Sequence, residues 1–132
     1  MKNKLHKIPI DVYNLDLLIF FGHMSECCKL LSKRLDQRYI DKLMEMGSDN
    51  KGLFFHVQDV YLIWLPDIPN TFRKYAILVH ELEHATYRIL TYKDLIHTAE
   101  SDEGYAYLLE YLYYKSLVLI NNLKKNRDEK EI

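Results

Sequence analysis

The chain has 132 residues, two cysteines, no long apolar run and a formal net charge of only −1. Cys27 and Cys28 are adjacent, which is a poor geometry for a mutual disulfide and offers no C-x-x-C chelate. We expect two reduced thiols on a helix, as in a cytosolic protein. No segment approaches the roughly 18 apolar residues of a membrane span, and the N-terminus lacks the apolar core of a secretory signal. The sequence therefore predicts a cytoplasmic location without a membrane span.

The charged residues form no extended basic surface. No basic stretch is interleaved with aromatic residues, so nucleic acid is not an expected partner. Basic and acidic residues alternate near the C-terminus, and we expect residues 122–132 to be a frayed helix end. At 48% hydrophobic, a chain of this length supports one core, and we expect a single domain over residues 1–132.

Hydrophobic periodicity predicts the order strand, strand, helix, strand, strand, helix, helix. The expected strands span residues 5–13 and 15–21, turned at Asn14, and then 53–57 and 60–65. One helix is expected from Gly22 to about Met46, another from Phe72 to Tyr92, and a third after Ser101, which is typical of an N-cap. This order predicts an α+β domain in which a small, twisted, largely antiparallel sheet packs with three helices.

The stretch from His80 to His84 reads HELEH. On a helix, His80 and His84 lie one turn apart on the same face and can bind one ion, while Glu81 beside them can act as general base for a water. The opposite side of the helix is apolar and suited to a core. A second interpretation is a solvated helix face without a ligand. The apolar residues on the side of the helix opposite the two histidines are Tyr75, Leu78, Leu82, Ala85 and Ile89.

A third metal ligand has to come from another element. The two last helices are expected to form an antiparallel pair, so an acid in the first turn of the second could reach the histidine face of the first. Glu103 is the candidate, because Ser101 places Glu100 before the helix and small Ala106 would let the helices approach. Acids in a first helical turn also interact with the helix dipole, and this explanation stays open for Glu103.

These residues resemble the gluzincin metallopeptidases, in which H-E-x-x-H is followed about twenty residues later by E-x-x-A. The second motif matches Glu103 to Ala106. More narrowly, residues 50–115 are similar to short phage-encoded zincin-like proteins, including Trp64-Leu65-Pro66 before the motif helix. The resemblance implies zinc bound by His80, His84 and Glu103. Glu83 departs from the family, since the variable motif positions are normally uncharged in peptidases.

Two further expectations concern the surroundings of this site. The resemblance implies that Tyr61–Leu65 is a sheet edge to which an extended substrate adds, although both faces of this segment are apolar and an interior strand is equally compatible. An oxyanion needs a donor opposite the base. Tyr107, one turn beyond Glu103, is the geometric candidate, and His97 in the connecting loop is the alternative.

The sequence thus predicts a zinc-dependent metallohydrolase acting on a peptide bond, with Glu81 and Tyr107 as catalytic residues. The alternative is a non-catalytic zinc-binding protein, either a phage structural or assembly protein or a binder of a host factor. Either interpretation implies a peptide or protein partner. A phage-encoded protein would act in the host cytoplasm or enter the virion.

Overall fold

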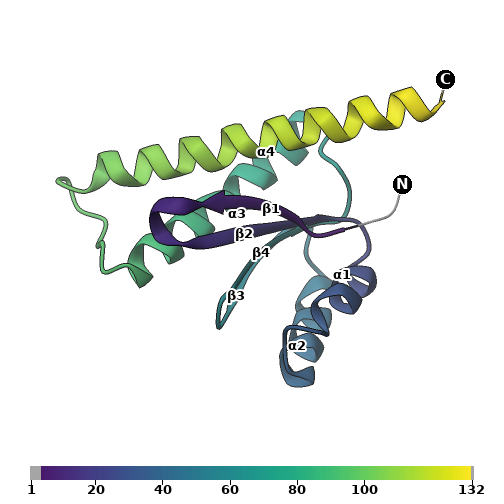
Figure 1. The fold of residues 1–132 in the computed structure, drawn as a ribbon, viewed down its shortest axis with the longest axis horizontal. Helices are drawn as coiled ribbons and strands as arrows, with labels where there is room; N and C mark the ends of the chain where they lie inside the picture. The colour runs from purple at the N-terminus through teal and green to yellow at the C-terminus, as the bar shows by residue number, and fades with distance from the viewer. Residues whose placement is uncertain (1–3, 132) are drawn as a thin grey trace.

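The structure, a computed structural model, describes the backbone of residues 4–131 and side chains up to residue 128. It confirms the α+β class, but four helices rather than three accompany the sheet (Figure 1). The elements are β1 (His6–Ile10), a short 3₁₀ turn (Asp11–Tyr13), β2 (Leu15–Phe21), α1 (Met24–Leu31), α2 (Gln37–Gly47), β3 (Leu53–Val57), β4 (Val60–Leu65), α3 (Phe72–Tyr92) and α4 (Asp102–Glu131).

The four strands form one mixed sheet in the order β1-β2-β4-β3. Both predicted hairpins are present and antiparallel, although the first strand ends at Ile10 and residues 11–13 form a 3₁₀ turn instead of continuing it. Each hairpin turns at a residue with positive φ: Asn14 at 52° and Gln58 at 54°. The two hairpins join through a parallel pairing of β2 with β4, in register from Leu17↔Tyr61 to Phe21↔Leu65. Consequently β1 and β3 are the edge strands.

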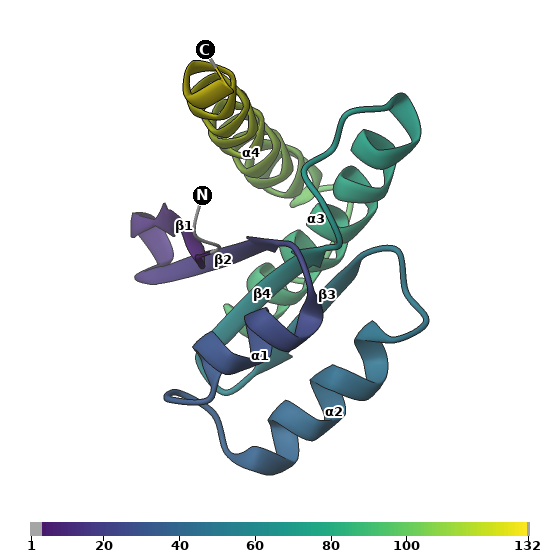
Figure 2. The same cartoon turned by 90° about the vertical axis from the view of Figure 1, so that its right-hand side faces the viewer.

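The helices cover both faces of the sheet. Figure 2 shows α1 and α2 on one side and α3 and α4 on the other. Strand β4 lies between these layers, and all six of its residues are buried. The expectation that Tyr61–Leu65 is a sheet edge was wrong, because β4 pairs with β2 on one side and with β3 on the other. The edge beside the motif helix is β3.

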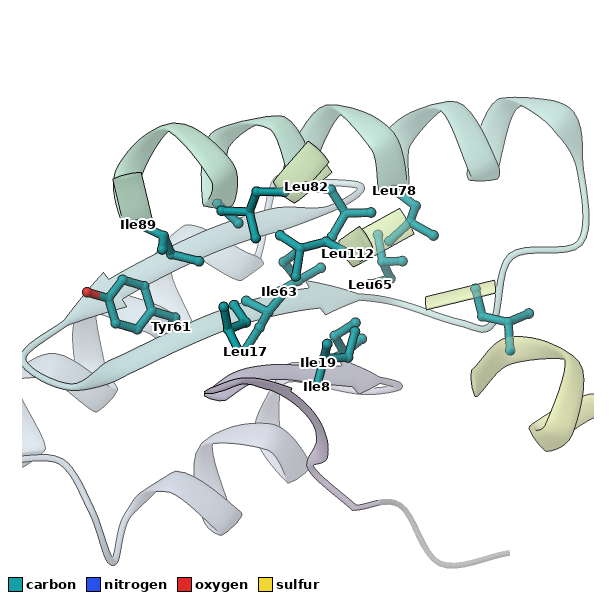
Figure 3. Close-up of a cluster of buried hydrophobic side chains, with 14 of the residues drawn as sticks. Ile8, Leu17, Ile19, Tyr61, Ile63, Leu65, Leu78, Leu82, Ile89 and Leu112 are labelled. Atoms are coloured by element: carbon teal, nitrogen blue, oxygen red, sulfur yellow. The ribbon is translucent and has the colours of Figure 1, made fainter. Parts of the chain in front are cut away.

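The larger core lies between the sheet and the pair α3 and α4. Figure 3 shows Leu78, Leu82 and Ile89 of α3 directed toward sheet residues that include Leu17 and Ile63. The apolar stripe predicted for α3 is buried or half-buried throughout its length. This packing fixes which face of α3 is turned away from the core, and His80 and His84 are on that exposed face.

The helix predicted from residue 22 to 46 is interrupted at residues 32–36, which was not foreseen. The Ser32 hydroxyl donates to the Lys29 carbonyl at 2.7 Å and competes with the backbone ladder there. A continuous helix of this length would span roughly 35 Å, longer than strands of five to seven residues. The break lets both Leu31 and Leu43 remain buried against the sheet.

Helices α3 and α4 pack as the predicted antiparallel pair. Near the start of α3, Tyr75 accepts a hydrogen bond from Lys124 late in α4, at 3.1 Å. At the other end, the Tyr105 hydroxyl donates to the Leu95 carbonyl at 2.6 Å. Ser101 precedes α4 as expected, but its hydroxyl bonds within the loop, where it accepts from the Thr98 backbone amide. Across the described residues, no helix combines the length and apolar character required to cross a membrane.

Candidate metal centre

Helix α3 begins at Phe72, where Thr71 accepts a hydrogen bond from the backbone amide of Lys74 at 3.2 Å. No glycine or proline interrupts the 21 residues that follow, so the four-residue spacing of the motif is kept. The Nε2 atoms of His80 and His84 lie 3.1 Å apart, and both rings are exposed. The helix therefore presents two imidazole nitrogens together at the surface.

Glu81 differs from both histidines because it is buried, with 7% of its surface exposed. Burial raises the pKa of its carboxyl group above the ordinary value, while charge on His80 and His84 and a backbone hydrogen bond from Phe54 act in the opposite direction. Phe54 belongs to the edge strand β3, so Glu81 fills the junction between α3 and that edge. A buried carboxyl group with a raised pKa is suited to accepting a proton near neutral pH.

His80, Glu81 and His84 form a group that could hold a metal ion, with one ligand atom from each within 4.8 Å of the others. Two ligands on a tetrahedral zinc, each at ~2.0–2.1 Å, lie roughly 3.3 Å apart. The 3.1 Å separation of the two Nε2 atoms is close to this value. The donor set and its spacing therefore fit a divalent transition metal.

The structure does not bring Glu103 into this group. Glu103 is exposed in the first turn of α4. Val79, next to His80, lines the same groove as Tyr113 of α4. Glu103 precedes Tyr113 by ten residues, or roughly 15 Å along the helix, so it lies far from His80. Ala106 is also exposed rather than between the helices. The helices pack antiparallel as expected, but in a register that places Tyr113, and not Glu103, near Val79.

Neither candidate oxyanion donor lies at the histidine pair. Tyr107 is 66% exposed and lines a hollow with Val12 and Tyr111, residues of the β1–β2 turn and α4. His97 contacts the Asp102 carboxylate at 2.7 Å and stacks on Tyr105. Both residues belong to the surroundings of α4, and neither lines the hollow that contains His80 and Glu81.

Sequence reasoning missed Lys51 and Arg73 beside the motif. Both line an open hollow of about 480 Å³ together with His80 and Glu81. Arg73 precedes His80 by two helical turns on the same side of α3, and this periodicity could have identified it. Lys51 lies in the turn before β3, and no local pattern connects that turn with α3.

The comparisons with known proteins yield no relative. The chain matches no family model, no curated protein and no solved structure. The residues and their geometry are therefore the basis for a functional interpretation.

Proposed function

We propose that the protein is a small zinc-dependent metallohydrolase acting on peptide bonds. The observation that carries the proposal is the 3.1 Å separation of two exposed imidazole nitrogens next to one buried carboxyl group. Two imidazoles fit zinc well, and a carboxylate adjacent to the ion is the usual proton acceptor in hydrolytic sites. The resemblance of the motif to gluzincins supports the same chemistry.

Each residue has a distinct role in this proposal. His80 and His84 would hold the ion, which when bound supplies a Lewis acid and makes water a better nucleophile. Glu81 would accept a proton from the attacking water and deliver it to the leaving amine, and its contact with Phe54 would keep it oriented. Arg73 and Lys51 line the same hollow and would attract an anionic group of the substrate away from the reacting carbonyl.

The decisive experiment compares cleavage of an unfolded protein by wild type and by Glu81→Gln at saturating zinc. Glu81→Gln should still take up the metal through the two histidines and lose activity by ~100-fold or more. His84→Ala should lose both metal and activity. Cleavage by Glu81→Gln at the wild-type rate would exclude this mechanism.

One observation favours the second candidate, a non-catalytic zinc-binding protein. No side chain of α4 joins the metal group among the described residues, whereas hydrolytic zinc sites usually have three protein ligands. Such a protein would bind a protein partner through the same surface. Its affinity for that partner would depend on zinc and would be insensitive to Glu81→Gln.

A further inference from the structure

Two hollows lie side by side along α3 and share part of their walls. The first contains His80 and Glu81 at the candidate metal centre. The second, of about 320 Å³, extends toward the start of α3 and is called the apolar pocket here. Lys51, Arg73 and Ile77 line both hollows. The apolar residues that line this pocket are Leu65, Pro66, Pro69 and Ile77.

Two unpaired cations lie where the hollows meet. Lys51 and Arg73 are exposed, and among the described residues neither takes part in an ion pair. Lys74 also lines the apolar pocket, but its ammonium group lies 2.7 Å from the carboxylate of Asp67 and is neutralised by it. A ligand spanning both hollows would therefore place an anionic group next to an apolar one.

We propose that the two hollows bind the C-terminal residues of a peptide substrate. The apolar pocket takes an apolar C-terminal side chain, and Arg73 and Lys51 bind the free α-carboxylate. A guanidinium group matches a carboxylate with two parallel hydrogen bonds, which gives both energy and orientation. The inference rests on the proposed function, because it names the substrate class of that site.

The spacing along α3 sets the expected position of cleavage. Arg73 and His80 are seven residues apart, or about 10 Å along the helix. An extended peptide covers this distance in roughly three residues, so the hydrolysed bond lies two or three residues before the C-terminus. Hydrolysis there breaks one C–N bond, adds the oxygen of water to the carbonyl carbon and leaves the released amine with a proton.

The experiment measures binding to the metal-free protein, so that it does not depend on turnover. Chelator-treated, ¹⁵N-labelled protein is titrated with the peptide acetyl-Ala-Ala-Ala-Leu as the free acid and as the C-terminal amide. We expect the amide to bind at least ~10-fold more weakly, since it loses the charge-assisted hydrogen bonds. A free acid that ends in serine should also bind more weakly, because serine does not fill the apolar pocket. An amidated peptide with an internal glutamate tests whether a side-chain carboxylate can replace the terminal one.

Matched variants locate the effect. Arg73→Gln and Lys51→Gln should each reduce the preference for the free acid, whereas Arg88→Gln, an exposed cation on the same helix that lines neither hollow, should keep it. Equal binding of acid and amide, preference for the internal glutamate, or no binding at millimolar peptide overturns the inference. These outcomes leave the metal and cleavage assays of the proposed function unaffected, and absence of zinc uptake would contradict the proposed function independently.

Discussion

Gly52 lies directly against Glu81 and Ile77. A Cβ atom on Gly52 would be 3.6 Å from Cγ of Glu81 and 2.6 Å from Cγ2 of Ile77. The turn before β3 can thus approach α3 only because residue 52 has no side chain. This close approach buries Glu81 while its histidine neighbours stay exposed.

The contact predicts that Gly52→Ala destabilises the protein. The new Cβ would also lie 2.9 Å from Cδ2 of Leu65, and overpacking of this kind costs about 1–3 kcal/mol. Chemical denaturation should show a lower free energy of unfolding. Gly104→Ala is the control, because nothing lies within 4 Å of its added Cβ and alanine is the better helix former. Equal stability of wild type and Gly52→Ala would contradict the close packing.

Zinc should stabilise the protein through His80 and His84. At a free zinc concentration 100 times the dissociation constant, binding adds about 2.7 kcal/mol, or a rise in Tm of roughly 10 °C. His80→Ala and His84→Ala should abolish this rise in a calorimetric scan, and a chelator should reverse it in wild type. His23→Ala is the control, since His23 makes no side-chain cap bond to α1. A rise retained in both histidine variants would exclude the site.

Glu103→Ala distinguishes the sequence-based ligand set from the geometry of the structure. The resemblance to gluzincins predicts a sharp loss of zinc affinity. The register of α3 and α4 gives the opposite expectation, because Glu103 lies outside the metal group. We expect an unchanged zinc dissociation constant for Glu103→Ala and a roughly 10-fold or larger increase for Glu81→Ala, which removes a carboxylate beside the ion. Competition titration with a chelating dye measures both, and a large effect of Glu103→Ala would restore it as a ligand.

His56 should make stability fall in mild acid. Burial, the largest cause, lowers its pKa below 6.5, and nearby Arg88 acts in the same direction against a backbone hydrogen bond involving Gln58. Below pH ~6.5 the unfolded chain therefore takes up a proton that the folded chain does not, and the free energy of unfolding decreases until the lower folded pKa is reached. Denaturation at pH 7.5 and 5.5 should show a smaller decrease in His56→Gln. His6, whose pKa is lowered by burial, contributes equally to both proteins. Identical decreases would contradict the prediction.

The amino-acid sequence by itself determined most of the local elements and the pair of candidate metal ligands, His80 and His84. Periodicity located α3 and both hairpins, since apolar alternation and a stripe at helical spacing are properties of neighbouring residues. The same spacing placed His80 and His84 on one face of α3, which needs only the geometry of a single helix. Glu103 and Tyr107, which the sequence placed one turn apart on the last helix, both lie on the exposed side of α4.

The tertiary structure decided which residues surround His80 and His84. The place of β4 in the sheet, the break after α1 and the register of α3 against α4 depend on how separate layers fill a common core. These long-range choices put Glu103 outside the group and bring Lys51 and Gly52 beside Glu81. Spacing within one helix can predict two ligands, but the residues that complete a site come from distant segments, and only packing determines which of them meet.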